Sequence, residues 1–251
     1  MATLSERRAA FRALHRSGCF AIPNPWDGGS AIRLAKLGFG ALASTSAGAA
    51  WALGKADGGM TLEEVLDHLR FLVGVTELPI NADFEAGFAD SPEGVATNVT
   101  RCIGTGVAGL SIEDRTGRTL YDFDLAVERM RAARAAIDRS GEDVMLVGRC
   151  EAFLVGQTDL AATIARLKAY GEAGADCVYA PGIRDLASIA RVVEALDKPV
   201  NANISGTTLS VQDMASVGVR RVSVGGALAR ATYVAFEGIA EALKTTGKLP
   251  S

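Results

Sequence analysis

The sequence has few of the residues that build histidine- or cysteine-based sites. Its 251 residues include only two histidines and four cysteines. The cysteines show neither CxxC spacing nor pairing with histidine, so we do not expect a histidine triad or a histidine-rich or cysteine-rich metal site. We interpret the cysteines as small buried side chains in a reducing compartment. His15 and His68 fall in helical patterns and are expected to face solvent.

Two further absences restrict the location and the partners. No apolar run approaches the roughly 18 residues of a membrane span, and residues 1–8 lack the apolar core of a signal peptide. The formal net charge is −3, without the basic excess that nucleic-acid recognition requires. We therefore expect a cytoplasmic protein that binds neither membranes nor nucleic acid.

The composition is that of a folded chain with a large core. Hydrophobic residues make up 49% and charged residues 22% of the sequence, which disfavours disorder. A chain of this length forms either one large domain or two small ones. No linker or low-complexity stretch divides it, so we predict a single domain over residues 1–251.

Short apolar runs alternate with helical patterns along the whole chain. The apolar runs are typical of buried parallel strands, and they end near Asn24, Ser46, Asp83, Glu113, Arg149, Pro181, Asn203 and Gly225. Helices are predicted over 30–37, 61–73, 91–104, 124–139, 160–170, 185–196, 210–217 and 227–243, after an N-terminal surface helix. Eight such units predict a (β/α)8 barrel of the TIM type. The alternative is a doubly wound open sheet, but no G-x-G-x-x-G follows the first strand.

Acidic side chains follow two neighbouring strands. Asn81, Asp83 and Glu85 alternate at one strand end, and Glu113 ends the next strand. In a barrel, these ends meet at the face where catalytic residues lie. Carboxylates clustered there repel one another unless a cation balances them. The pattern suits Mg²⁺, which needs one or two carboxylates and keeps several waters.

Other polar residues at strand ends suggest substrate contacts. Arg149 could bind a carboxylate or phosphate, and it could also neutralise Glu113 as an ion pair. We interpret Asn203 as a neutral hydrogen-bond partner for a polar ligand. Asp57, in a glycine-rich loop, is either a turn residue or a site residue. The hydroxyl groups and exposed amides after the second strand could bind a carboxylate, and they belong to Thr45, Ser46 and Ala47.

Several motifs in this order resemble the isocitrate lyase/phosphoenolpyruvate mutase superfamily. They are Thr45-Ser46-Ala47-Gly48 with Gly54-x-x-Asp57, Asn81-Ala82-Asp83, Ser111-Ile112-Glu113-Asp114 and Gly148-Arg149-x-Glu151-Ala152-Phe153. The resemblance implies an α/β barrel, usually tetrameric, with a helix exchanged between subunits. It also implies Mg²⁺ and the cleavage or formation of C–C or C–P bonds in 2-oxo or 2-hydroxy carboxylates through an enolate.

The resemblance also assigns roles to residues of this chain. Asp83 and Glu113 match the metal-site acids, and Arg149 matches the substrate-binding arginine. Asp57 matches the aspartate near the reacting carbon. Thr45 and Ser46 match the loop that binds the substrate carboxylate.

Two departures bear on the reaction. Asn81 stands where the superfamily usually has the first acid of an Asp-Ala-Asp motif, which removes one negative charge from the metal site. The segment 115–122 contains neither cysteine nor histidine, so the Lys-Lys-Cys-Gly-His stretch of the isocitrate and methylisocitrate lyases is absent. The chain therefore resembles the phosphoenolpyruvate mutase-like branch that lacks the loop cysteine.

These patterns lead us to expect a Mg²⁺-dependent carbon–carbon lyase or hydrolase, with Mn²⁺ as an alternative metal. Its substrate is expected to be a small 2-oxo or 2-hydroxy (di)carboxylate such as oxaloacetate or a methylisocitrate-like acid. The alternatives are C–P chemistry on phosphonopyruvate and a barrel that binds 2-oxo acids without turnover. We expect a homo-oligomer, a dimer or tetramer. The expected catalytic residues are Asp57, Arg149 and Glu113, the metal ligands Asp83, Glu113 and Glu85, and the substrate contacts Thr45, Ser46, Ala47, Asn81, Arg149 and Asn203.

Overall fold

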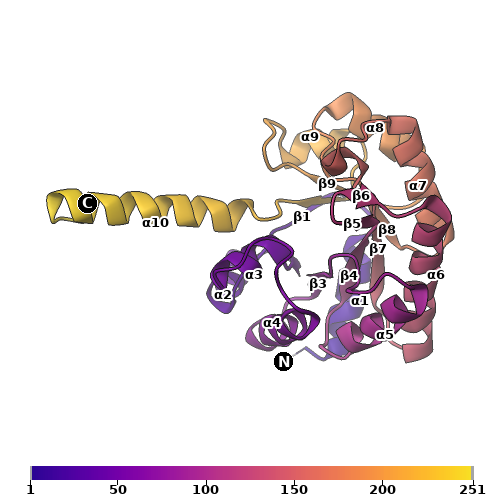
Figure 1. The fold of residues 1–251 in the computed structure, drawn as a ribbon, viewed down its shortest axis with the longest axis horizontal. Coiled ribbons are helices and arrows are strands. Elements are labelled where there is room, and N and C mark those ends of the chain that lie inside the picture. The colour runs from indigo at the N-terminus through magenta and orange to yellow at the C-terminus, as the bar shows by residue number, and fades with distance from the viewer. Residues whose placement is uncertain (1, 250–251) are drawn as a thin grey trace.

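Eight parallel strands form one sheet that curls into a barrel (Figure 1). The computed structural model describes residues 2–249. The strands are β1 (Phe20–Ile22), β2 (Leu42–Ala43), β3 (Ile80–Asp83), β4 (Gly109–Glu113), β7 (Met145–Arg149), β8 (Cys177–Tyr179), β9 (Val200–Asn203) and β10 (Arg221–Ser223). They are hydrogen-bonded in the order β1-β10-β9-β8-β7-β4-β3-β2. The Ala43 amide donates to the Pro23 carbonyl at 3.1 Å and links the two outer strands. The predicted (β/α)8 barrel is confirmed.

Helices follow the strands, and most of them pack around the sheet. They are α2 (Gly28–Lys36), α3 (Ser46–Ala52), α4 (Leu62–Val75), α5 (Pro92–Ile103), α6 (Phe123–Ser140), α7 (Leu160–Glu172), α8 (Leu186–Glu194), α9 (Val211–Ser216) and α10 (Ala227–Thr246). Most begin at a capping side chain, as Thr61 does for α4. The predicted helices therefore agree with the observed ones to within a few residues at each end.

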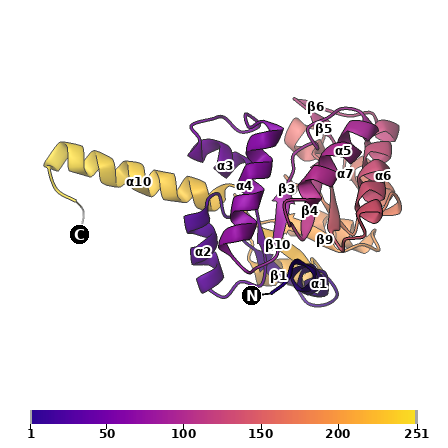
Figure 2. The same cartoon turned by 90° about the horizontal axis from the view of Figure 1, so that it is seen from below.

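The N-terminal helix α1 (Leu4–Leu14) closes the bottom of the barrel (Figure 2). Its Phe11 side chain is fully buried and packs with Ile22, Ala41 and Met145. His15 follows this helix and is 5% exposed, because its ring lies edge-on to Phe11 and Phe20. The expectation that His15 faces solvent is therefore wrong. The same expectation for His68 is also wrong, because that side chain is half-buried.

A short helix and a hairpin near the carboxyl ends of the strands were not predicted. The segment after β2 forms the short helix α3, in which the Thr45 hydroxyl accepts from the Gly48 amide at 3.3 Å and caps the first turn. The segment after β4 forms a hairpin of β5 (Arg115–Thr116) and β6 (Thr119–Leu120). Both elements are too short for hydrophobic periodicity to reveal them.

Helix α10 extends away from the barrel in both views (Figures 1 and 2). Of its 20 residues, only Ala229 is buried. Phe236, Ile239 and Leu243 are 66%, 46% and 47% exposed, and their spacing places them on one helical face. Within residues 2–249, no helix combines the length and apolar character needed to cross a membrane.

Candidate active site

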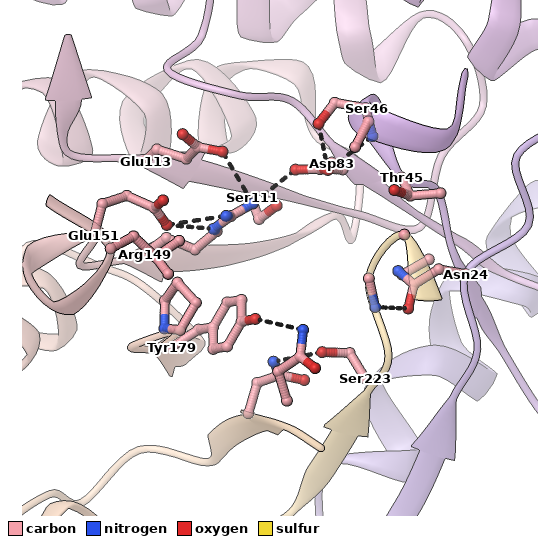
Figure 3. A pocket seen from close by; sticks show the side chains of 18 of the residues that line it. Asn24, Thr45, Ser46, Asp83, Ser111, Glu113, Arg149, Glu151, Tyr179 and Ser223 are labelled. Atoms are coloured by element: carbon pink, nitrogen blue, oxygen red, sulfur yellow. Dashed lines mark hydrogen bonds and ion pairs between the residues drawn. The ribbon is translucent and has the colours of Figure 1, made fainter. Parts of the chain in front are cut away.

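A cavity of about 260 Å³ opens at the carboxyl ends of the strands (Figure 3). Every residue that the sequence analysis assigned to the site lines it. The topology explains this convergence, because the carboxyl ends of all eight parallel strands meet at one face. The roles assigned to these residues stay predictions. They are Thr45, Ser46, Ala47, Asp57, Asn81, Asp83, Glu85, Glu113, Arg149 and Asn203.

Arg149 lies among three carboxylates (Figure 3). Its Nη1 is 2.7 Å from Asp83 Oδ1 and 3.0 Å from Glu113 Oε1, and its Nη2 is 2.9 Å from Glu151 Oε1. Burial alone would lower the pKa of Arg149, but Glu113, Glu151 and Asp83 raise it well above its usual value. The guanidinium therefore stays charged and fixes the three acids relative to one another. The expected ion pair with Glu113 is present.

Arg115, on the hairpin, adds a second cation to this cluster. Its Nε is 3.0 Å from Glu113 Oε2 and 3.5 Å from Glu151 Oε2. Glu151 is fully buried, and burial raises its pKa, whereas Arg149 lowers it. Two guanidinium groups thus lie among three carboxylates. Glu85 and Asp57 add two further acids to the lining of the same cavity.

Glu85 has the least compensated charge in the cluster. Its Oε1 is buried and has no hydrogen-bond partner within the part of the chain that the structure describes. Burial raises its pKa to about 7, and the charges of Asp83, Glu113 and Asp57 add to this. Its backbone is left-handed, with φ of 46°, and its carbonyl accepts from the Glu113 amide at 2.9 Å. The strained conformation thus brings a buried carboxyl group next to the acids of β3 and β4.

The donor set fits a divalent cation that keeps most of its water. Among residues 2–249, no three or more His, Cys, Asp or Glu side chains are arranged to hold a metal ion directly. Mg²⁺ does not require such a cage, since one or two carboxylates and several waters satisfy it. Asp83, Glu85 and Glu113 line the same cavity, and the unpartnered Glu85 oxygen marks where positive charge is lacking.

The groups expected to bind a substrate carboxylate after β2 are partly occupied. Ser46 donates to Asp83 Oδ2 from its amide at 2.9 Å and from its hydroxyl at 2.8 Å. The Thr45 hydroxyl caps α3. These two residues therefore orient Asp83 and the helix, and the sequence could not show this because the partners are far apart in the chain.

Four further cavity residues carry polar contacts that sequence reasoning did not assign. Asn24 Oδ1 accepts from the amides of Val224 and Gly225 at 3.0 and 2.8 Å, which occupies part of that turn. The Asn203 amide donates to the Tyr179 hydroxyl at 3.2 Å. The sequence feature that could have identified all four residues is a polar side chain in or just after an apolar strand. The four are Asn24, Glu151, Tyr179 and Arg221.

A protein-family model described as phosphoenolpyruvate phosphomutase matches residues 11–244. The chain belongs to this family. It is accordingly an enzyme of the isocitrate lyase/phosphoenolpyruvate mutase superfamily, as its motifs predicted.

Curated relatives with named activities include a lyase and a decarboxylase. The chain is 33% identical to the 2-methylisocitrate lyase of Escherichia coli K12, over 78% of this chain and 69% of that protein. It is also 33% identical to the oxaloacetate decarboxylase of Pseudomonas paraeruginosa PA7, over 88% of this chain and 80% of that protein.

Solved structures share the fold closely. A Burkholderia cenocepacia J2315 protein, provisionally described as a lyase/mutase, is 46% identical with a TM-score of 0.95, over 98% of this chain and 90% of that chain. A 2,3-dimethylmalate lyase of the same superfamily is 28% identical with a TM-score of 0.88, over 100% of this chain and 90% of that chain.

Proposed function

We propose that this enzyme is a Mg²⁺-dependent lyase or hydrolase that cleaves a C–C bond in a small 2-oxo or 2-hydroxy (di)carboxylate, with oxaloacetate as the leading substrate. The observation that carries the proposal is the buried acidic cluster around Arg149 in a small cavity. A cavity of about 260 Å³ favours a substrate of a few carbon atoms. The activities of the two named relatives support the same choice.

Asp83 and Glu113 are the residues that would hold Mg²⁺ or Mn²⁺, partly through water, with Glu85 as the third acid. A bound divalent ion supplies Lewis-acid stabilisation of charge that develops on substrate oxygens. Arg149 holds Asp83 and Glu113 in place through its ion pairs with both acids. Because the ion pairs already engage both of its terminal nitrogens, we assign it first to positioning these acids and second to contacting a substrate carboxylate.

The remaining cavity residues would orient the substrate and move protons. Asp57 lines the cavity, and its charge contributes to the raised pKa of Glu85. It is our choice for proton transfer or for positioning a water molecule. Asn81, Asn203 and the Ala47 backbone would offer neutral hydrogen bonds to the substrate.

C–P chemistry is the second candidate. The family model that matches the chain is described as a phosphomutase, and residues 115–122 lack the cysteine and histidine of the lyase loop. The test is turnover of oxaloacetate and of phosphonopyruvate with Mg²⁺ present, with products identified by ¹³C and ³¹P NMR.

We expect oxaloacetate to give either pyruvate and carbon dioxide or, on hydrolysis, oxalate and acetate. Conversion of phosphonopyruvate alone would replace our proposal with C–P chemistry. Binding of 2-oxo acids with no turnover of any would replace the proposed enzyme activity with a non-catalytic binding function. Asn81 in place of an acid would then explain the lack of activity.

We also propose that the protein is a cytoplasmic homo-oligomer, a dimer or tetramer. The free cysteines Cys19, Cys102, Cys150 and Cys177 support a reducing compartment. The exposed apolar face of α10 supports association, because such faces are typical of interaction sites. In the proposed assembly, α10 packs on a neighbouring copy.

A further inference from the structure

Arg221 is a cation buried inside the barrel, and the partners that the described part of the chain gives it are neutral. It begins β10, is 3% exposed and lines the cavity. Its Nε donates to Asn201 Oδ1 at 2.9 Å and its Nη1 donates to Asn81 Oδ1 at 3.3 Å. Both acceptors are neutral amide oxygens. Within residues 2–249, no carboxylate lies within salt-bridge distance of Arg221, and its Nη2 makes no hydrogen bond.

The contrast with Arg149 shows how unusual this environment is. Arg149 is surrounded by three carboxylates, which offset the cost of burying it. Burial instead lowers the pKa of Arg221, and the nearby charge of Arg149 lowers it further. Burying a cation without a counter-charge carries a large desolvation penalty. A buried arginine is therefore expected to meet an anion in the functional state.

The position of Arg221 indicates which anion this is. In the register of β9 and β10, Arg221 pairs with Asn201, and Ser223 pairs with Asn203 two residues further along. Arg221 therefore lies one layer deeper in the barrel than Asn203 and Ser223. It reaches across to Asn81, two residues below Asp83 on β3. The cavity thus has an acidic upper part, suited to a metal ion, and an uncompensated guanidinium at its floor.

We propose that Arg221 binds the second carboxylate of the substrate and so selects a dicarboxylate over a monocarboxylate. This inference rests on the proposed function, because it assumes a small acid whose other end lies at the acidic cluster. Arg221 is then a specificity residue beside the acids and Arg149. Its Nη2, which makes no hydrogen bond within residues 2–249, would donate to this carboxylate.

The proposal also gives a reason for Asn81. An aspartate at this position would face Nη1 of Arg221 at about the present 3.3 Å and would form a buried ion pair with it. That pair would neutralise the cation at the cavity floor. An amide holds the guanidinium by a hydrogen bond and leaves its charge available to the substrate.

The experiment compares two probes by isothermal titration in the presence of Mg²⁺. Oxalate spans only two carbons and reports the acidic part of the cavity. 3,3-Difluorooxaloacetate is a four-carbon 2-oxo dicarboxylate that can also reach the floor. Arg221→Gln and Asn81→Asp should each weaken the four-carbon probe about ten- to hundredfold. Arg221→Gln should change oxalate affinity by less than about threefold, and Arg221→Lys should restore part of the loss for the four-carbon probe.

Arg220→Gln is the matched control, because Arg220 is the adjacent arginine, does not line the cavity and donates to the Gly18 carbonyl. It should leave both affinities unchanged. Circular dichroism establishes that each variant is folded, and Asn81→Asp still decides the question if Arg221→Gln does not fold.

Three results would overturn the inference. The first is unchanged affinity for the four-carbon probe in a folded Arg221→Gln variant. The second is tighter binding of that probe by Asn81→Asp, which would show that Asn81 matters only as a missing metal ligand. The third is a wild-type protein that binds neither probe, which would refute the proposed function and this inference together.

Discussion

Arg149 is the residue on which the candidate site depends most. It contacts Asp83, Glu113 and Glu151, and these acids come from three different strand ends. Removing one partner of a buried charge network leaves the other charges uncompensated, which costs about 3–5 kcal/mol. We therefore propose that Arg149 supports both the fold and the activity.

We therefore expect Arg149→Ala to lower the free energy of unfolding by about 3–5 kcal/mol and kcat/KM by about a hundredfold or more. Urea denaturation and steady-state kinetics measure the two effects. Arg149→Lys should recover more stability than activity, because one ammonium group cannot hold three carboxylates at once. Wild-type kcat/KM in an Arg149→Ala variant would show that Arg149 has no role in the active site.

We expect Glu85 to make the stability of the metal-free protein depend on pH. Burial and neighbouring acids raise its pKa to about 7 in the folded chain, from an ordinary value of 4.5. The folded state therefore binds this proton more tightly than the unfolded state. The stability it contributes is complete below about pH 4.5 and is lost as the pH rises through about 7.

Comparison with Glu85→Gln isolates this effect, because the other titrating groups, including buried His15, are common to both proteins. Between about pH 5 and pH 8, the unfolding free energy of the wild type should fall relative to that of Glu85→Gln by about 1–3 kcal/mol. Urea denaturation of both proteins without metal measures the difference. A difference that does not change with pH would show that Glu85 ionises normally.

The sequence predicts which residues line the cavity better than it predicts their partners. Asp83, Glu113 and Arg149 could be placed together because each ends an apolar run, and strand ends meet at one face. The contact between Ser46 and Asp83 and the unpaired state of Arg221 could not be predicted. They depend on side-chain directions and on partners 37 and 140 residues apart in the chain.

At the scale of secondary structure, long elements were predictable and short ones were not. Helix α6 has a clear apolar stripe and was located to within a residue at each end. Helix α3 and the β5–β6 hairpin were missed, and both border the cavity through Ser46 and Arg115. Segments of two to seven residues carry too little periodicity, and tertiary contacts decide their conformation.

For a single element, the testable prediction concerns the proposed role of helix α10 in joining subunits. If its apolar face joins subunits, Phe236→Asp together with Ile239→Asp should convert the oligomer to smaller species, because a charge in an apolar interface is strongly unfavourable. Size-exclusion chromatography with light scattering measures the mass. Glu237→Lys with Glu241→Lys, on exposed positions of the same helix, is the control. A monomeric wild type, or an assembly unchanged by the double Asp variant, would contradict the role of α10.

For the whole molecule, the barrel follows from the alternation of apolar runs and helices, whereas the chemistry follows from a handful of side chains at one face. This division is general, since one barrel supports many reactions. Here the acidic part of the cavity has more carboxylates than close cations. The central claim is that a divalent metal ion completes the site and binds a small carboxylate together with it.

Isothermal titration of metal-stripped protein with oxalate, with and without Mg²⁺, tests this claim most directly. Oxalate resembles the enolate of pyruvate in charge and shape. We predict tight binding with Mg²⁺ and at least about a hundredfold weaker binding without it, since the acids alone repel a dianion. Equal affinity in both conditions, or no binding in either, would contradict a metal-dependent site at Asp83 and Glu113.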